Sequence, residues 1–344
     1  MRIAFFAPAP LDLLTGGYVY NRRMIDEWRA AGHDATIAGL TGTHPLADDA
    51  ARESARAAWA AMPDDAVPVI DNLALPSFAP LAADLTTRRA VLLDHHPTGL
   101  EPGLNAEIAS ALIAIETQLL PRFRCVVTTS DTIAATVAND FGVARDRLHT
   151  IVPGTDDAPR SQGSGGKIVH VLSIGSLIPR KGHDILLRAM ARLFDLDWRL
   201  TIAGTERLDP AYAAQIKALA GELGIAGKVT FLGETSGAPL AALWDSADIF
   251  ALATRYEGFG MVIAEALKRG LPVVVGNGGA AGALIRPDYG AVCPVDDVEQ
   301  TSRALRRIIF DTRLRQDMSD AAWSAGRDVP GWKTQADAFA ALLA

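Results

Sequence analysis

The sequence predicts an α/β protein with two doubly wound domains, each a parallel sheet covered by helices. Two observations support this prediction. Short apolar runs alternate with longer amphipathic segments along the whole chain, and a single Pro/Gly/Ser tract at residues 152–166 interrupts that alternation near the middle. The length of 344 residues also exceeds that of an ordinary single core. We therefore expect two cores separated at residues 152–166.

The first half contains short apolar runs that predict buried strands, and periodic segments between them that predict helices. The predicted strands cover Ile3–Ala7, Ala35–Ala38, Val67–Ile70, Ala90–Leu93, Cys125–Thr128 and Leu148–Val152. The predicted helices cover Tyr18–Ala31, Asp49–Ala61, Glu101–Leu120 and Asp131–Phe141. Strands that alternate with helices in this way indicate a parallel sheet.

The second half repeats this alternation, although no sequence repeat relates the two halves. The predicted strands cover Ile168–Ser173, Leu200–Ala203, Val229–Leu232, Ile249–Leu252 and Pro272–Val275. The predicted helices cover Gly182–Leu193, Pro210–Leu223, Ala238–Ala247 and Gly260–Arg269, with further helices toward the C-terminus. The tract between the halves is a linker by its composition, so we expect domains at residues 1–156 and 167–328.

Composition and charge narrow the function. Hydrophobic residues make up 49% of the chain and charged residues 21%, as in an ordinary globular protein, and no apolar run is long enough to span a membrane. Residues 1–156 hold 12 arginines, no lysine and 19 acidic residues, whereas the remainder is balanced. An acidic half disfavours nucleic acid as a partner. We expect a cytoplasmic protein, with peripheral contact to the inner face of a membrane left open.

The two cysteines and the N-terminus support the same compartment. Cys125 and Cys293 fall in predicted strands without metal-ligand or redox spacing, so we expect two buried free thiols. The first residues, Met1–Pro8, read as a strand rather than as a signal peptide. No cluster of His, Cys, Asp and Glu has the spacing of a metal site.

The segment at 254–267 is the most informative stretch of the chain. A predicted strand ends in a turn that contains Gly258 and Gly260, and this turn opens a predicted helix. Glu257 and Glu265 stand on either side of the helix start, separated by roughly 10 Å if the helix is regular. Free N–H groups at a helix start bind phosphate or sugar oxygens. This geometry suits a nucleotide-sugar, with one carboxylate on the sugar hydroxyls and the other on the ribose diol.

The second half resembles the retaining GT-B-fold glycosyltransferases of family 4, also called glycosyl transferases group 1. In the second half the resemblance rests on an ordered series of motifs: residues 175–184, 200–204, 229–233, 257–265 and 270–275. In the first half it rests on residues 15–17, 94–97 and 152–156. It implies two Rossmann-like doubly wound domains facing across a cleft. The first would bind the acceptor and the second the nucleotide-sugar donor, and residues 329–344 would form a crossover helix returning to the first domain.

The resemblance also implies residue roles. Glu257 would contact the donor sugar and Glu265 the ribose, while Arg180 and Lys181 would neutralise the diphosphate. A departing nucleoside diphosphate gains negative charge as the sugar bond breaks, so fixed cations stabilise the transition state more than the ground state. Many relatives carry arginine directly after the glycine of the first motif, where this chain has Ser176. Either Arg180 takes over that contact or the diphosphate is held more weakly.

Two histidines follow a predicted strand of the first half. The resemblance implies that one of them faces the donor sugar; we favour His95 over His96, and spacing does not decide between them. The catalytic set implied by the resemblance is His95, His96, Arg180, Lys181 and Glu257. The donor-binding set adds Gly16, Gly17, Ser176, Thr205, Gly233, Gly258, Phe259, Gly260, Met261 and Glu265. No cofactor and no metal ion are expected beyond the donor itself.

The predicted activity is that of a retaining hexosyltransferase (EC 2.4), which moves a sugar from a nucleotide-diphosphate sugar to the hydroxyl of a sugar, lipid or small molecule. We favour a UDP-sugar as the donor. Two alternatives remain: a nucleotide-sugar epimerase on the same scaffold, and a non-catalytic nucleotide-sugar-binding protein. A dinucleotide dehydrogenase is disfavoured because no G-x-G-x-x-G motif opens either domain.

Overall fold

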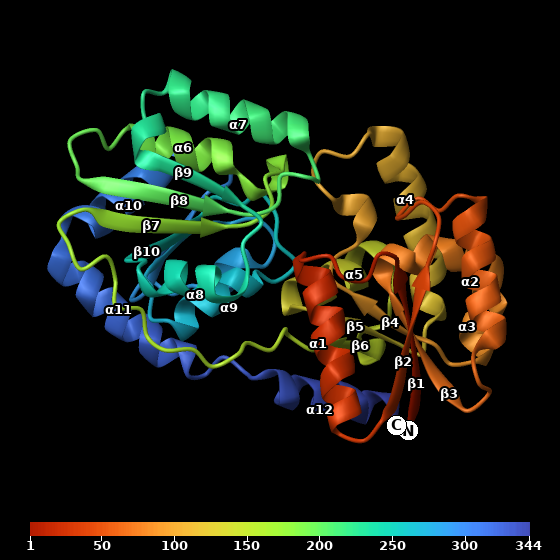
Figure 1. The fold of residues 1–344 in the computed structure, drawn as a ribbon. Helices are drawn as coiled ribbons and strands as arrows, with labels where there is room; N and C mark the ends of the chain where they lie inside the picture. Colours follow the sequence, from red (N-terminus) through yellow and green to blue (C-terminus); the bar gives the residue numbers. More distant parts are fainter. The chain divides into compact units, whose positions relative to one another are not determined.

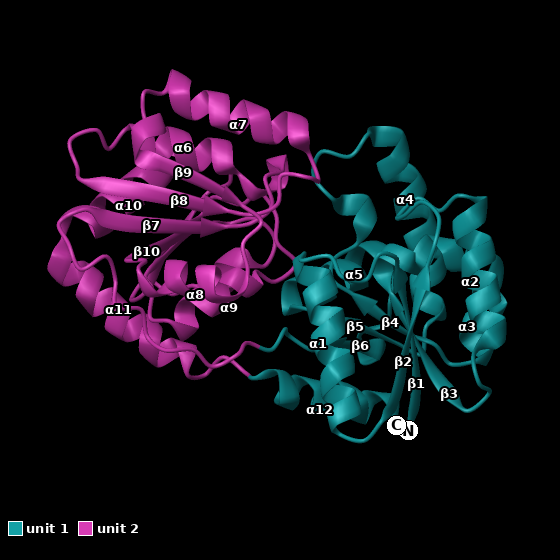
Figure 2. Cartoon of the chain, in the orientation of Figure 1, with its two compact units in different colours: residues 1–154, 331–344 teal, residues 155–330 magenta.

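The computed structural model describes residues 1–344, which divide into two compact units (Figure 2). Unit 1 comprises Met1–Gly154 together with Gly331–Ala344, and unit 2 comprises Thr155–Pro330. The structure differs from the sequence-based expectation at the linker, because residues 155–166 belong to unit 2. Two Rossmann-like units, each with a six-stranded parallel sheet, confirm the predicted fold class.

Unit 1 contains a parallel sheet in the order β2-β1-β3-β4-β5-β6 (Figure 1). The strands are β1 Arg2–Pro8, β2 Asp34–Leu40, β3 Ala66–Asp71, β4 Val91–Asp94, β5 Cys125–Thr128 and β6 Leu148–Thr150. The helices are α1 Gly16–Ala30, α2 Asp49–Ala61, α3 Ala82–Thr87, α4 Ala106–Leu119, α5 Asp131–Phe141 and α12 Trp332–Leu343. The 3₁₀ segments are η1 Asn72–Leu81, η2 Thr98–Leu100, η3 Leu120–Arg122 and η4 Arg145–Arg147.

The strand order of unit 1 reverses between β1 and β3. From β1 the chain passes through α1 to β2 on one side of β1, whereas β3 pairs with the other side of the same strand. Ligands of doubly wound sheets bind outside the carboxyl ends of the strands at such a reversal. The segments that meet there are Thr15–Gly17 at the start of α1 and Asp71–Asn72 at the end of β3.

One helix differs clearly from its predicted bounds. The sequence pattern predicted a helix over Glu101–Leu120, but α4 begins only at Ala106. The side chain of Asn105 caps α4 by accepting a hydrogen bond from the backbone N–H of Glu107 at 2.8 Å. Gly103 has a φ of +92°, which is incompatible with a right-handed helix. The apolar periodicity therefore extended the helix beyond its physical start.

Helix α12 belongs to the core of unit 1 although it is last in sequence. Phe339 packs edge-on against Trp28 with ring centroids 5.1 Å apart, and the indole N–H of Trp28 donates to the carbonyl of Ala336 at 3.1 Å. Trp332 packs edge-on against Tyr20 at 5.8 Å. Trp28 also packs against Phe5 of β1, with ring centroids 6.4 Å apart, so α12 joins the core that α1 forms with the sheet.

Unit 2 contains a parallel sheet in the order β12-β11-β10-β7-β8-β9. Its strands are β7 Val169–Ile174, β8 Trp198–Ala203, β9 Val229–Gly233, β10 Ile249–Leu252, β11 Val273–Gly276 and β12 Gly290–Cys293. Its helices are α6 His183–Ala191, α7 Pro210–Glu222, α8 Gly237–Asp245, α9 Met261–Lys268, α10 Val298–Phe310 and α11 Thr312–Gly326. Its 3₁₀ segments are η5 Pro179–Lys181, η6 Ala226–Lys228 and η7 Ala281–Leu284. Strand order reverses between β7 and β10, which pair directly.

The predicted linker is fastened to unit 2 rather than free. The hydroxyl of Ser161 donates to the carbonyl of Asp245 at 2.8 Å, and the backbone N–H of Gly163 donates to the same carbonyl at 3.0 Å. Arg160 binds Ser319 and Asp320 on α11. The Gly/Ser-rich segment is therefore an ordered part of unit 2 with many polar contacts, and it is not a flexible linker.

No helix of the structure combines the length and apolar character that crossing a bilayer requires. Cys125 and Cys293 are buried free thiols, as predicted. Burial raises the pKa of both thiols.

We predict that Phe339→Ala lowers the free energy of unfolding of unit 1 by about 3–5 kcal/mol, because it leaves a cavity beside Trp28. Urea denaturation followed by Trp fluorescence measures the change. Phe310→Ala is the matched control, since Phe310 on α10 is 76% exposed. Equal effects of the two substitutions would contradict a core role for α12.

Candidate functional site

The candidate site of unit 2 lies where strand order reverses, at the carboxyl ends of β7 and β10. The segment after β7 carries Ser176, Arg180 and Lys181, and the segment after β10 carries Thr254 through Gly260. Because β7 and β10 are hydrogen-bonded neighbours, the two segments emerge side by side. The sequence-predicted cations and the first predicted carboxylate are thereby brought into contact.

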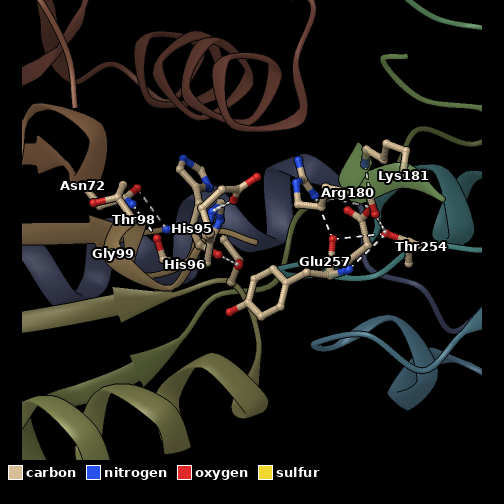
Figure 3. A network of polar contacts seen from close by, with 12 residues as sticks. Asn72, His95, His96, Thr98, Gly99, Arg180, Lys181, Thr254 and Glu257 are labelled. Atoms are coloured by element: carbon tan, nitrogen blue, oxygen red, sulfur yellow. Dashed lines mark hydrogen bonds and ion pairs between the residues drawn. The ribbon is translucent and has the colours of Figure 1, made fainter. Parts of the chain in front are cut away.

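Lys181 and Glu257 form a buried ion pair (Figure 3). Lys181 Nζ lies 2.5 Å from Glu257 Oε1, and the hydroxyl of Thr254 lies within hydrogen-bonding distance of the same oxygen at 3.1 Å. Arg180 approaches the same oxygen at 3.6 Å. Only 9% of the Glu257 side chain and 13% of the Lys181 side chain are exposed. The site is therefore a compact cluster with two positive charges and one negative charge.

The cluster keeps Glu257 ionised. Burial by itself raises the pKa of the Glu257 carboxyl, but the charges of Lys181 and Arg180 together with the Lys181 hydrogen bond outweigh burial and leave that pKa lowered. The backbone of Glu257 is also fixed, because its N–H donates to the carbonyl of Gly278 at 3.1 Å. The carboxylate is thus held charged in one place.

Arg180 is tied to the β10 segment through both its backbone and its side chain. Its carbonyl accepts a hydrogen bond from the N–H of Arg255 at 2.8 Å, and its guanidinium donates to the carbonyl of Tyr256 at 2.8 Å. Gly182 closes the turn with a φ of +64°, and a Cβ there would lie 1.9 Å from the carbonyl oxygen of Ala253. Only glycine permits this approach.

A second ion-pair network braces the same turn from outside. Arg255 makes a two-pronged contact with Asp184 at 3.0 and 2.8 Å, and it also binds Asp296 at 2.6 Å. Tyr212 donates to Asp184 at 2.9 Å. Burial opposes ionisation of Asp184, but the Arg255 guanidinium and the Tyr212 hydroxyl leave its pKa lowered. The network joins α6, α7, the β10 segment and the segment after β12.

Glu265 stands in a different environment from Glu257. Helix α9 begins at Met261, one residue after the predicted start, and Gly260 is its N-cap with a φ of +102°. No group of the chain donates a hydrogen bond to the partly buried carboxylate of Glu265. Burial raises its pKa to about 7, with Asp156 contributing in the same direction and Arg269 opposing.

The remaining predicted donor residues lie along the same sheet edge. Thr205 follows β8, and its carbonyl accepts a hydrogen bond from the N–H of Leu177 beside Ser176 at 2.9 Å. Gly233 ends β9 with a φ of +66°, and its carbonyl accepts from Gly204 N–H at 2.8 Å. Of the glycine turn itself, Phe259 is 8% exposed and Met261 starts α9.

The candidate site of unit 1 lies where its own sheet reverses. His95 follows β4, and a Cβ on Gly17 would lie 3.3 Å from the His95 ring, so the Gly16–Gly17 turn and this histidine are in contact. His95 Nε2 lies 3.1 Å from Asn21 Oδ1 and 3.4 Å from Asp71 Oδ2. Sequence analysis identified Gly17 and His95 but missed Asn21 and Asp71.

The loop of the two histidines is held on several sides (Figure 3). The amide of Asn72 accepts from His95 N–H at 3.3 Å and donates to the carbonyl of His96 at 2.6 Å. Glu116 on α4 accepts hydrogen bonds from both the backbone and the hydroxyl of Thr98. The ring of His96 contacts Glu101 at 2.6 Å. The structure therefore separates the histidines: His95 reaches α1 and β3, whereas His96 pairs with an acidic residue of its own loop.

Asp71 had a signal that the sequence analysis could have used, as did Thr254 beside Glu257, whereas Asn21 on α1 had none. Asp71 directly follows the predicted strand Val67–Ile70. Thr254 stands two residues after the end of the predicted strand Ile249–Leu252. Polar residues at the carboxyl ends of parallel strands meet at one edge of the sheet. Within residues 1–344, no three His, Cys, Asp or Glu side chains converge as metal binding would require.

We predict that Glu265→Gln raises the melting temperature by a few degrees at pH 8 and has little effect near pH 4.5. The folded pKa of about 7 lies above the unfolded value of 4.5, so the native state of the wild type loses stability as pH rises through this window and the deficit persists above it. Glutamine does not ionise and removes the deficit. Thermal melts from pH 4.5 to 8.5 measure it; a pH-independent difference would contradict the burial of an ionisable carboxyl.

Comparison with known proteins identifies the family of unit 2. Residues 155–324 match the family described as "Glycosyl transferases group 1". The chain is 32% identical over 215 residues to the GDP-mannose-dependent alpha-(1-6)-phosphatidylinositol monomannoside mannosyltransferase of Mycolicibacterium smegmatis. This alignment covers 59% of this chain and 54% of that protein. The alignments span about half the length of such curated relatives, at 52%, 51% and 54%.

Solved structures resemble the chain over nearly its full length. The sucrose-phosphate synthase (tll1590) of Thermosynechococcus elongatus has a TM-score of 0.85 at 19% identity, covering 99% of this chain and 98% of that one. Anabaena Alr3699/HepE, solved in complex with UDP and glucose, has a TM-score of 0.78 at 18% identity, covering 100% and 99%. At these identities the likeness shows the fold. Unit 2 thus carries the match to the glycosyl transferases group 1 family, and the chain has the two Rossmann-like domains of the GT-B fold.

Proposed function

We propose that the chain transfers a hexose-type sugar from a nucleoside-diphosphate sugar to an acceptor hydroxyl, with retention of anomeric configuration. The observation that carries the proposal is the Arg180–Lys181–Glu257 cluster at the reversal point of the family-matched unit. Sheet topology brings two cations and a carboxylate together at the place where doubly wound folds bind ligands, which supports a site for a diphosphate and a sugar.

The two cations suit a diphosphate. Lys181 offers a compact charge and Arg180 a planar fork, which together match the several oxygens of a diphosphate. As the sugar–phosphate bond breaks, negative charge grows on the departing diphosphate, and cations that are already fixed need no reorganisation to stabilise it. The ties of Arg180 to Arg255 and Tyr256 supply that fixation. We propose that these two charges serve where a divalent metal ion serves in other transferases.

The carboxylates suit the two other parts of the donor. Glu257 is held charged beside the cations, where it can accept hydrogen bonds from sugar hydroxyls. Glu265 takes no hydrogen bond from the chain and is available to the ribose diol. Burial raises its pKa to about 7, so near neutral pH the protein without ligand presents both the acid and the carboxylate form to the diol.

The reaction then needs no enzyme nucleophile. In a front-face substitution the acceptor oxygen bonds to the anomeric carbon on the side from which the diphosphate leaves, and the departing phosphate oxygen takes the acceptor's proton. The sugar keeps its configuration, and the nucleoside diphosphate is released. We assign the acceptor, a sugar, a lipid or a small molecule, to unit 1, and a substrate hydroxyl to His95.

The identity of the donor is a finer part of the proposal. We favour a UDP-sugar, with support from the Anabaena structure that was solved with UDP and glucose. The Mycolicibacterium relative carries the name of a GDP-mannose-dependent enzyme, so a guanosine donor is the competing candidate. A thermal-shift panel of UDP, GDP, ADP and their sugars separates these candidates.

We predict that one nucleotide of this panel stabilises unit 2, by about 2.7 kcal/mol at 100 times its Kd. If the cations contact the diphosphate, Lys181→Ala abolishes most of the stabilisation by this nucleotide. The nucleoside without phosphates stabilises neither the wild type nor the variant. A stabilising nucleotide without nucleotide release in the presence of any acceptor would favour a binding protein. Sugar inversion without an acceptor would favour an epimerase.

We predict that Lys181→Ala, Arg180→Ala and Glu257→Gln each lower turnover at least tenfold, about 1.4 kcal/mol of transition-state stabilisation. A nucleotide-release assay measures the loss. Glutamine is chosen for Glu257 because it keeps the size and one acceptor oxygen of the side chain. Removing one partner of a buried ion pair costs about 3–5 kcal/mol of stability, so the melting temperature of each variant, Lys181→Ala included, is measured beside its turnover. Lys333→Ala is the matched control, since Lys333 pairs with Asp337 at 2.7 Å on the surface of α12. Near-wild-type turnover in all three variants would refute the assignment.

A further inference from the structure

We propose that Asp71 and Asn21 are positioning residues that hold His95 with its proton on Nε2 and leave Nδ1 as the nitrogen that meets the substrate. The catalytic consequence of this inference rests on the proposed function. The tautomer itself depends only on the contacts of His95 with Asp71 and Asn21 within unit 1. Neither Asp71 nor Asn21 belongs to the motifs that identified the family.

The three residues come from three elements that meet at the reversal of the sheet. Asp71 ends β3, Asn21 lies in the second turn of α1, and His95 follows β4. The β3–β4 pairing places Asp71 beside Leu93, so the carboxylate emerges next to the histidine loop. Glycine at position 17, in the first turn of α1, lets the helix approach the ring closely, since a Cβ there would lie 3.3 Å from it.

The hydrogen bonds fix the tautomer of His95. Asn21 Nδ2 donates to Asp71 Oδ2 at 2.5 Å, so the amide turns its oxygen, Oδ1, toward the ring. His95 Nε2 therefore faces two acceptors, Asn21 Oδ1 at 3.1 Å and Asp71 Oδ2 at 3.4 Å. A ring nitrogen that faces only acceptors carries the proton. Nδ1 receives no hydrogen bond from the chain.

Asp71 is placed to act through His95 and not on a substrate. Its side chain is 1% exposed, and its other oxygen, Oδ1, accepts the backbone N–H of Leu73 at 2.8 Å. Asn21 is 2% exposed. Both oxygens of the carboxylate are therefore occupied by the chain. Burial leaves no room for a sugar to reach either side chain, whereas the His95 side chain keeps 14% of its surface.

The other groups around the ring do not compete for Nε2. The ring of Tyr20 packs edge-on at 5.2 Å, and its hydroxyl donates to the carbonyl of Ile151. Thr129 donates to the backbone carbonyl of His95 at 3.1 Å. The charged or titratable groups nearby are buried Asp94, whose pKa is raised well above its usual range by burial, and Glu116, which caps Thr98. Asp71 is thus the acidic group that contacts the ring.

A fixed tautomer has a chemical use. The lone pair on Nδ1 accepts a hydrogen bond from a substrate hydroxyl while the ring is neutral, and the adjacent carboxylate stabilises positive charge if the ring takes up a proton. Loss of Asp71 frees the ring to adopt the other tautomer, in which Nδ1–H is a donor and repels the hydroxyl proton. Partners that orient a metal-ligating histidine are worth roughly 10–100-fold in affinity or activity, and we take that range as the expected scale here.

The kinetic test is a double-mutant cycle. We expect Asp71→Ala to lower kcat roughly 10–100-fold with the donor KM changed less than about threefold, and Asp71→Asn, which keeps an acceptor oxygen, to recover part of the loss. Because Asp71 acts through His95, Asp71→Ala/His95→Ala has the same kcat as His95→Ala. Multiplicative losses would overturn the inference. Asp65→Asn, at the opposite end of β3 and exposed, is the matched control.

The second test reads the ring directly and needs no turnover. In ¹⁵N NMR of ring-labelled histidine at a pH where the ring is neutral, we expect His95 in the wild type to show a protonated Nε2 and an unprotonated Nδ1. Asp71→Asn, which keeps the fold by melting temperature, shows a mixture. A protonated Nδ1 in the wild type would overturn this inference alone, whereas absence of transfer with the expected tautomer would overturn only the proposed function.

Discussion

The buried contact between Lys181 and Glu257 is the interaction on which the organisation of unit 2 depends. Removing two charges from water is costly, and a lone buried pair often stabilises less than apolar residues of the same size would. Here the surroundings offset the cost: Thr254 and Arg180 crowd the same carboxylate oxygen, and glycine at position 182 lets the two segments pack backbone to backbone. The cluster holds two cations and one carboxylate, so it keeps a net positive charge, which suits the diphosphate that we propose as its ligand.

Much of the fold follows from the sequence because its strands are buried on both faces. Such strands read as uninterrupted apolar runs, and the runs at Cys125–Thr128 and Ile249–Leu252 match the observed strands residue for residue. Pattern reasoning failed where local chemistry overrode periodicity. Asn105 starts α4 five residues later than the apolar pattern indicated, and the Gly/Ser tract at 155–166 is held by hydrogen bonds to residues that no sequence pattern connects with it.

The candidate site was predictable to the extent that short local motifs contain its residues. Glu257, Lys181 and the glycine turn lie in short motifs that could be found, but the spacing predicted for the two glutamates assumed a regular helix between them. The helix starts at Met261, so Glu257 belongs to an extended segment paired with Gly279. Asn21 and Asp71 are 50 residues apart in sequence and acquire their roles only through sheet order, which the alternation of elements leaves open. Long-range register, rather than residue type, was the missing information.

The position of α12 has a consequence for biosynthesis. Unit 2 interrupts unit 1, so the first segment to leave the ribosome lacks the partner that covers Trp28 and Tyr20 until Trp332 and Phe339 have been made. Unit 2 can complete its core before unit 1, whose core still lacks α12. This reverses the usual order of cotranslational folding, in which the N-terminal domain folds first. An apolar face on α1 is therefore exposed during most of translation, and it is the surface on which a nascent-chain chaperone would act.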